Sequence, residues 1–131
     1  MTPDRGSEAE RKLTEAEFQR QVTDLAELLG WEWAHFRPAL TAKGWRTPVS
    51  GPLGKGWPDL VLVHAAKKRL IFAELKSEKG RLTWDQARVH ETLTTLDWHH
   101  WKTEGIGWVL PRLELHTWRP TDFDEIQMAL R

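Results

Sequence analysis

The sequence contains no cysteine among its 131 residues, which excludes disulfide bonds and thiolate metal ligands. Any metal ligands must therefore be oxygen atoms or imidazole nitrogens. Long apolar runs are also missing, because no stretch of about 18 apolar residues is present. Residues 1–12 are polar, where a signal peptide would have an apolar stretch. We therefore expect a soluble cytoplasmic protein without a membrane-spanning segment.

The chain also has no excess of either charge, with 19 basic and 19 acidic residues, and this balance argues at first against a nucleic-acid partner. The charges are unevenly distributed, however. The net charge is −4 over residues 1–36, +7 over residues 37–90 and −3 over residues 91–131. Because salt screens charges beyond ~10 Å, the basic middle block attracts a polyanion even on a neutral protein. A solvated charged face is the alternative interpretation.

The length predicts one domain over residues 13–131, with a frayed or disordered segment at residues 1–12. Apolar spacing predicts a first helix over 14–29, with Phe18, Val22 and Leu25 on one face and Gly30 as its stop. Residues 38–57, rich in Gly, Pro and basic side chains, are expected to form a long loop.

Two later stretches, 58–64 and 69–76, are apolar at nearly every position, as in strands that are covered on both faces. Further strands are expected at 31–37, 105–111 and 113–119, and further helices at 83–96 and 121–130. The order of these elements predicts the α/β class, with a central mixed β-sheet flanked by helices.

A short connection between 58–64 and 69–76 predicts a hairpin in which His64 faces Arg69 and Asp59 faces Glu74. Residues that face each other across two strands have Cβ atoms about 4.5–5.5 Å apart, so the two carboxylates would repel unless they shared a cation. Lys76 points to the same side as Glu74, while the Leu75 side chain points to the other. The alternative is an ordinary Glu74–Lys76 surface pair at a strand end.

Carboxylate ligands without cysteine suit hard ions such as Mg²⁺ or Mn²⁺, which keep several waters and accept phosphate oxygens. Such an ion polarises a phosphodiester and lowers the pKa of a bound water. Lys76 would then stabilise developing negative charge, or position and deprotonate the attacking water. This combination is typical of a metal-assisted phosphodiester hydrolase.

The stretch "WPDLVLV…LIFAELKSEKGRLTWDQ" resembles the PD-(D/E)XK nucleases, with Pro58 and Asp59 as the PD and residues 74–76 as the E-x-K. It is most similar to the VRR-NUC branch in its small stand-alone form, in which an acidic helix, a PDL strand, an E-x-K strand and a Q-containing helix recur in this order. The resemblance covers roughly residues 14–126. It implies a restriction-endonuclease-like core and divalent-metal cleavage of DNA, in several members of branched or four-way (Holliday) junctions.

The resemblance also implies a role for each site residue. Asp59 and Glu74 would bind the metal, with Leu75 as a further ligand, and Lys76 would act on the water or on charge. An acid from the first helix would join them. Glu15 shares the stripe of Phe18 and Val22, whereas Glu17 lies three residues after Thr14 as in a capping box, so Glu15 is the expected ligand.

Two of these residues also have a plain structural explanation. A first-turn acid such as Glu15 is favoured by the helix dipole. Gln86 matches the family's glutamine, which would orient water or substrate, but it also completes a capping box with Thr83.

The tryptophans number nine, which is far above usual usage. Trp31, Trp33, Trp108 and Trp118 fall in expected strands and are predicted to be core residues. Trp45 and Trp57 lie in the basic loop and could stack on exposed bases. Trp98 and Trp101 are candidates for a dimer surface. The expected DNA-binding set is Lys43, Arg46, Lys55, Trp57, Lys79 and Arg81.

Taken together, these patterns predict a small Mg²⁺- or Mn²⁺-dependent DNA endonuclease that is selective for branched structures or nicks DNA. A homodimer is expected, because a symmetric pair of sites suits the cutting of two strands. The alternative is a DNA-binding or interaction module that has kept the fold and does not cleave. RNA as the substrate stays open.

Overall fold

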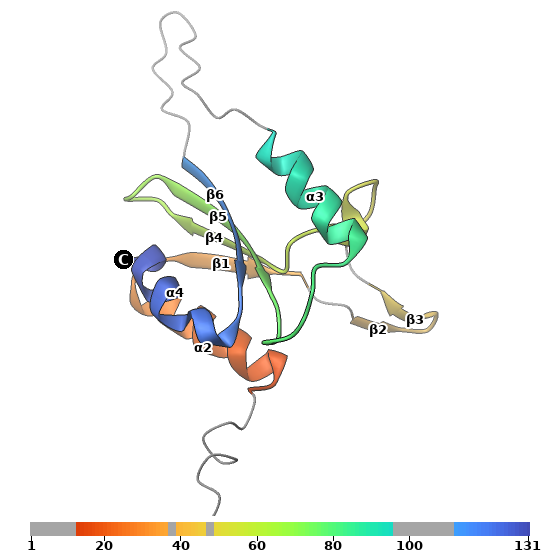
Figure 1. The fold of residues 1–131 in the computed structure, drawn as a ribbon, viewed down its shortest axis with the longest axis horizontal. Helices are drawn as coiled ribbons and strands as arrows, with labels where there is room; N and C mark the ends of the chain where they lie inside the picture. Colours follow the sequence, from red (N-terminus) through yellow and green to blue (C-terminus); the bar gives the residue numbers. More distant parts are fainter. Residues whose placement is uncertain (1–12, 37–38, 47–48, 96–111) are drawn as a thin grey trace, which may run out of the picture.

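The computed structural model describes residues 13–36, 39–46, 49–95 and 112–131. Figure 1 shows the arrangement of its helices and strands. In order they are α2 (Glu15–Leu28), β1 (Glu32–His35), β2 (Ala39–Thr41), β3 (Gly44–Arg46), the 3-10 helix η1 (Gly54–Gly56), β4 (Leu60–His64), β5 (Arg69–Leu75), α3 (Trp84–Thr94), β6 (Arg112–Trp118), the 3-10 helix η2 (Pro120–Asp122) and α4 (Phe123–Leu130).

Four strands form one mixed sheet in the order β1, β4, β5, β6, as expected for the α/β class. β4 pairs antiparallel with both β1 and β5, whereas β5 and β6 are parallel. A parallel pair needs a crossover connection, and α3 lies in the connection from β5 to β6. In the β4–β5 hairpin His64 faces Arg69 and Leu60 faces Ala73, which confirms the predicted register.

One face of this sheet carries the main hydrophobic core. Strand alternation places Leu60, Leu62, Ile71 and Ala73 on the same side, and all four are fully buried. They pack against buried residues of α2 and α4, including Phe18, Val22, Ala26, Ile126 and Leu130. Figure 1 shows α2 and α4 together on one side of the sheet, with α3 on the other.

Both ends of α2 are determined by local chemistry. The Thr14 hydroxyl accepts the Glu17 N–H at 3.1 Å, and the Glu17 carboxylate accepts the Thr14 N–H at 3.2 Å. This reciprocal capping box satisfies two N–H groups that have no partner inside the helix. Gly30 follows the helix with a φ of +89°, a left-handed conformation that glycine adopts without strain.

The second face of the sheet is covered less completely than the sequence predicts. Val63 on β4 is 40% exposed, so the expectation that both faces are covered is wrong at this end of the strand. Closer to the other end, Phe72 makes an edge contact with Trp57 at a ring-centroid distance of 5.3 Å. The α3 helix contributes buried Val89 and Leu93 on this side.

Two further expectations need correction. The segment expected to be a loop contains the β2–β3 hairpin; strands of three residues are too short to show a period of two in the sequence. Trp33, predicted as a core residue, is 37% exposed because β1 is an edge strand, and its Nε1 donates to Glu27 at 2.9 Å. Trp31 and Trp118 are buried as predicted.

Several predictions fall outside the described residues. They are the frayed segment 1–12, the strand at 105–111 and the positions Trp98, Trp101 and Trp108. No helix within the described ranges is long and apolar enough to cross a membrane.

A half-buried ion pair joins the two parallel strands. Arg69 on β5 donates Nε and one terminal nitrogen to the two carboxylate oxygens of Glu114 on β6, at 2.7 and 2.9 Å. The Arg69 guanidinium also lies over the Trp31 ring, 5.0 Å from its centroid. Burial alone would raise the pKa of Glu114, but hydrogen bonds and charge from Arg69 and His116 outweigh it and hold the pKa below its usual value. The pair therefore contributes stability while Glu114 is ionised.

We predict that Glu114→Gln lowers the free energy of unfolding by about 1.5–3 kcal/mol at pH 7, the usual loss for a hydrogen bond to a charged group. Because the folded-state pKa is depressed, this contribution is present above the ordinary pKa of a glutamate and is lost as the pH falls through the folded value. Urea unfolding at pH 7 and pH 3 measures it. Glu91→Gln, which changes an exposed carboxylate on α3, is the control. An equal loss at both pH values would contradict the prediction.

Candidate active site

An acidic pair lies where β4 begins and β5 ends. Extending the β4–β5 register by one residue places Asp59 opposite Glu74, on the face of the sheet that α3 covers. Asp59 Oδ2 accepts the Leu75 N–H at 2.9 Å, and the Asp59 carbonyl accepts the Phe36 N–H at 2.8 Å. Asp59 is therefore fixed from both neighbouring strands, with its carboxyl group against that of Glu74.

The two acids have different environments. Asp59 is half-buried, whereas Glu74 is 1% exposed and is the only fully buried charged residue in the described part of the chain. Burial, then the charge and hydrogen bonding of Asp59, raise the pKa of Glu74 to about 8, and the Lys76 ammonium offsets this in part. Glu74 therefore holds a proton at neutral pH when no cation is present.

Hydrogen bonds hold one oxygen of Glu74 and leave the other unsatisfied. Gln86 Nε2 donates to Glu74 Oε1 at 2.7 Å. Glu74 Oε2 is buried, and no described residue gives it a hydrogen bond. A buried carboxylate oxygen without a donor is costly, so it indicates a group that accepts a ligand or a proton.

Gln86 serves both of the roles that its sequence context predicts. Its Oε1 accepts the Thr83 N–H at 2.8 Å, and the Thr83 hydroxyl accepts the Gln86 N–H at 3.1 Å, which completes the capping box of α3. The same side chain then donates Nε2 to Glu74. Formation of the helix therefore places the amide on the acidic pair.

A close approach by Gly56 positions the first turn of α3. A Cβ atom at Gly56 would lie 2.1 Å from the Asp85 carbonyl oxygen and 2.8 Å from the Gln86 nitrogen. These are main-chain atoms, so they cannot move aside without moving the helix. Gly56 therefore allows η1 to pack directly on the turn that carries Gln86.

We predict that Gly56→Ala lowers the free energy of unfolding by about 1–3 kcal/mol, as usual for overpacking, because α3 must move away from η1. Thermal unfolding checks this. Gly80→Ala is the matched control, since its Cβ would meet the Ser77 hydroxyl at 2.8 Å, and a hydroxyl can rotate. A Gly56→Ala protein as stable as Gly80→Ala would contradict the close packing.

Lys76 lies one residue beyond β5. Its N–H donates to the Trp118 carbonyl at 2.9 Å, which ties this end of β5 to β6. Its side chain is half-buried, and its charge lowers the pKa of Glu74. The structure thus brings Asp59, Glu74, Lys76 and Gln86 together, as the sequence predicts.

His90 is a neighbour of this group that sequence reasoning missed. Burial, then the charge of Lys76, lowers its pKa, so His90 is neutral near pH 7. Its Nε2 is buried and has no hydrogen-bond partner among the described residues. The signal in the sequence was its spacing: His90 follows Gln86 by four residues, so the two side chains lie on the same face of a helix.

Glu15 does not join the acidic pair. It is exposed in the first turn of α2, so the expectation that it lies on the inward stripe is wrong. The physical reason is that α2 packs on the face of the sheet opposite to Glu74. Glu17 completes the capping box with the N-cap residue Thr14, as predicted. Within the described ranges, no three His, Asp or Glu side chains lie close enough to hold a metal ion.

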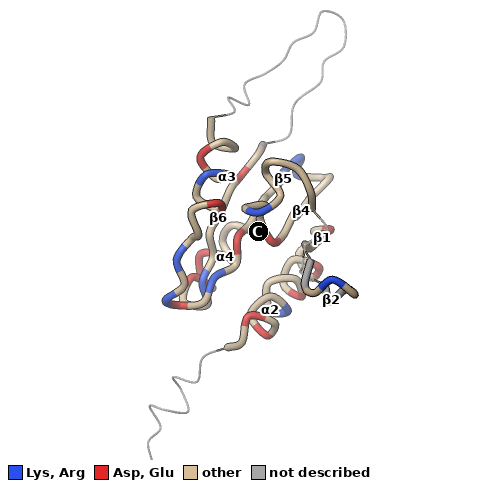
Figure 2. Tube along the Cα trace, turned by 90° about the vertical axis from the view of Figure 1, so that its right-hand side faces the viewer, with Lys and Arg blue, Asp and Glu red and all other residues tan. Residues whose placement is uncertain are grey.

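The residues expected to bind DNA lie on three segments: the β2–β3 hairpin, η1 with the residue after it, and the connection from β5 to α3. Lys55, Lys79 and Arg81 are exposed, and Lys and Arg recur along the segment from β5 to α3 (Figure 2). Lys43 is exposed in the β2–β3 turn and Arg46 ends β3. Trp57 is half-buried against Phe36 and Phe72, which favours a structural role over the predicted base stacking.

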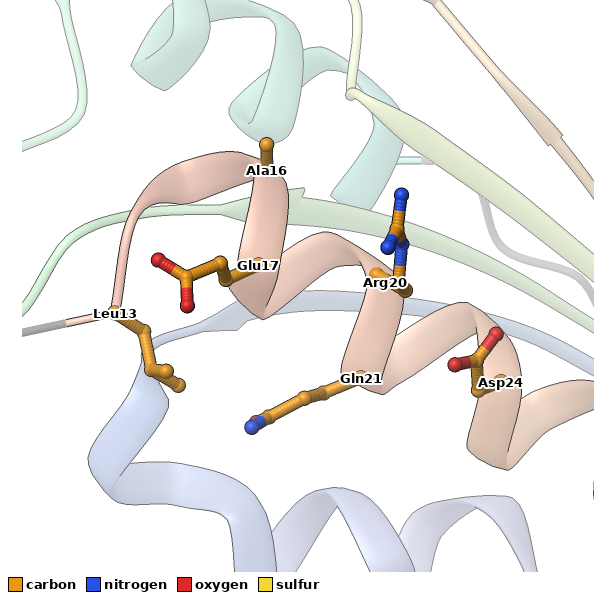
Figure 3. Close-up of a pocket in the computed structure, with 6 residues that line it drawn as sticks. All are labelled: Leu13, Ala16, Glu17, Arg20, Gln21 and Asp24. Atoms are coloured by element: carbon orange, nitrogen blue, oxygen red, sulfur yellow. The ribbon is translucent and has the colours of Figure 1, made fainter.

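A separate hollow of about 380 Å³ lies along α2. Its walls combine two acidic side chains, one basic side chain, one amide and two apolar side chains (Figure 3). The lining residues are Leu13, Ala16, Glu17, Arg20, Gln21 and Asp24. Asp59, Glu74, Lys76 and Gln86 are all absent from its lining. It is therefore not part of the acidic site.

Comparison with models of protein families, with characterised proteins and with solved structures finds no significant match to the chain.

We predict that the raised pKa of Glu74 makes the metal-free protein less stable as the pH rises from about 4.5 to about 8. The folded state binds a proton in this window that the unfolded state has released, so the free energy of unfolding must fall. Glu74→Gln mimics the protonated acid and should remove this slope, leaving the variant more stable than wild type at pH 9. Unfolding in EDTA from pH 5 to pH 9 measures the effect, with Glu91→Gln as the control. A slope that survives in Glu74→Gln would contradict the assignment.

Proposed function

We propose that the protein is a cytoplasmic divalent-metal-dependent endonuclease with a restriction-endonuclease-like core, which hydrolyses phosphodiester bonds of DNA and either selects branched structures or nicks one strand. The observation that carries the proposal is the buried Glu74, which is held against Asp59 and has one oxygen to which no described residue donates a hydrogen bond. Because the charge of Asp59 opposes ionisation of Glu74, a cation that joins both groups favours their ionised forms, and such a fixed pair favours a function that brings a cation to it.

The donor set fits a hard divalent ion. Asp59 and Glu74 provide carboxylate oxygens, and the unsatisfied Glu74 Oε2 is available as a ligand. The N–H of Leu75 points toward Asp59, and in a strand the N–H and C=O of one residue point the same way. The Leu75 carbonyl is therefore the further ligand, since its side chain is buried in the core. Two carboxylates with several waters are typical of Mg²⁺ sites.

When bound, Mg²⁺ or Mn²⁺ would polarise the phosphodiester and lower the pKa of a coordinated water. Lys76, on the same side of the sheet, supplies a positive charge for the negative charge that develops on the phosphate oxygens. Gln86 holds Glu74 in one rotamer through its amide, so the carboxylate keeps its position as the charge changes. Because the pKa of His90 is lowered, His90 is neutral, and the positive charge beside Glu74 comes from the Lys76 ammonium.

The surroundings suit a polyanionic substrate. Lys55, Lys79 and Arg81 are exposed, and they lie on the chain segments that precede β4 and follow β5. These residues belong to the basic segment 37–90, and such charges bind phosphate groups without recognising the base sequence. A homodimer would present two such sites to the two strands of a duplex or junction.

The decisive experiment is a cleavage assay on linear, nicked, flap and four-way DNA with and without Mn²⁺. We predict metal-dependent cleavage by the wild type and a loss of roughly 100-fold or more in Glu74→Ala and Lys76→Met, the range for removal of a charge-stabilising group. Glu91→Ala, an exposed acid on α3, should keep full activity. Mn²⁺ should also raise the melting temperature of the wild type and not of Glu74→Gln, which tests metal binding without activity.

Cleavage that persists in EDTA or in Glu74→Ala would overturn the proposal. Equally tight DNA binding by wild type and Glu74→Ala, with no cleavage in any divalent metal, would instead favour a DNA-binding module that has kept the fold.

A further inference from the structure

Trp84, the first residue of α3, is 77% exposed and is the most exposed tryptophan that the structure describes. Single exposed apolar side chains are common on protein surfaces. Trp84 differs in its location, because it precedes Gln86 by two residues, and the Gln86 amide contacts Glu74 at 2.7 Å. The indole therefore lies on the same helical turn as Gln86 and faces solvent without contributing to the core.

The backbone under Trp84 is held firmly. Thr83 and Gln86 cap the turn reciprocally, and the close approach of Gly56 packs the main chain of Asp85 against η1. A side chain on such a turn keeps its position when a ligand arrives, so little entropy is lost on binding. An aromatic ring on a rigid turn is suited to contact a planar group.

Helical geometry gives the position of the indole relative to the acids. Residues two apart differ by about 200° around the axis, so Trp84 and Gln86 lie on opposite sides of the first turn. Both side chains lean toward the helix N-terminus. Trp84 is thus displaced from the acidic pair by about a helix diameter, roughly 10 Å, and a nucleotide on it would lie near the cleaved phosphate without being the one attacked.

The surroundings of Trp84 carry positive charge. Arg81 precedes it by three residues and is exposed, and Lys55 is exposed on η1, which packs against the same turn. Arg88, one turn along the same side of α3, donates to the Pro52 carbonyl and so joins the loop before η1 to the helix. An aromatic platform with cations around it is complementary to a base whose backbone carries phosphates.

We propose that Trp84 stacks on an unpaired DNA base next to the cleaved phosphate and thereby selects substrates with a single-stranded arm. Within a duplex, neighbouring base pairs cover both faces of each base, so an indole can stack only on a base that is unpaired, terminal or flipped out. The inference rests on the proposed nuclease function, whose substrate it narrows from DNA in general to DNA with unpaired bases.

Binding of two oligonucleotides tests this inference, using Glu74→Ala protein in which cleavage cannot consume the probe. One is a duplex with a single-stranded arm that contains 2-aminopurine, a base whose fluorescence falls on stacking, and the other is the fully paired duplex. We expect Trp84→Ala, added to Glu74→Ala, to bind the arm about 10-fold more weakly and to lose the quenching, while binding of the paired duplex changes less than 2-fold. Trp84→Phe should bind the arm more tightly than Trp84→Ala, because phenylalanine keeps an aromatic ring.

Met128→Ala is the matched control, because Met128 on α4 is 73% exposed but lies on the other side of the sheet. It should bind both probes as the parent does. Equal binding of the arm by Trp84→Ala and Met128→Ala would overturn the proposal. So would a Trp84→Ala protein that binds both probes normally but changes its molecular mass in solution, because the indole would then contact another protein chain.

The wild-type cleavage assay separates this inference from the function that it refines. Cleavage whose preference for the arm survives Trp84→Ala would overturn the stacking alone. A Trp84-dependent preference in binding, combined with no cleavage by the wild type, would support the stacking and overturn the nuclease.

Discussion

The site depends on a repulsion that the fold enforces, namely two carboxyl groups held against each other at the end of a hairpin. The β4–β5 register places Asp59 opposite Glu74, and the Leu75 N–H and the strand pairing to β1 prevent Asp59 from moving away. A register shift of one residue would move one acid to the other face and into the core. The buried residues Leu62, Ile71 and Ala73 therefore determine the position of the acids as well as the stability of the sheet.

The second face of the sheet is organised around these acids. In place of a second full hydrophobic layer, it receives α3, whose first turn brings an amide to Glu74. Gly56 makes this possible because any side chain there would meet the main chain of Asp85. The short η1 segment and the capping box act together, so that folding of α3 and positioning of Gln86 are the same event. Such coupling of a helix end to a charged group is costly to maintain and is typical of functional sites.

The sequence predicts the scaffold better than the details that depend on distant contacts. The strands of the hairpin and their register were predictable because both strands are strongly apolar and their connection is short. The β2–β3 hairpin was not, because three-residue strands have no visible period. Glu15 and Trp33 were misplaced for one reason: periodicity identifies a face of a helix or strand but not what lies against it. Glu15 is at the exposed end of α2, and Trp33 is on an edge strand. The place of His90 in the site could not be predicted, because its burial and its proximity to Lys76 arise only when α3 packs on the sheet.

The unequal environments of the two acids divide their roles. Asp59 is half-buried, and its Oδ2 accepts the Leu75 N–H at 2.9 Å. Glu74 is deeply buried, with one oxygen held by Gln86 and the other without a donor among the described residues. Burial and the neighbouring Asp59 raise its pKa to about 8, so it binds a proton up to about that pH. A cation would displace that proton, because its charge favours both carboxylates in the ionised form. Metal binding and deprotonation of Glu74 would then be a single equilibrium. The charge of Lys76 lowers the pKa of Glu74 but does not outweigh the effects of burial and Asp59. No carboxylate in the described ranges forms a close ion pair with the Lys76 ammonium, so it can respond to negative charge that develops on a substrate.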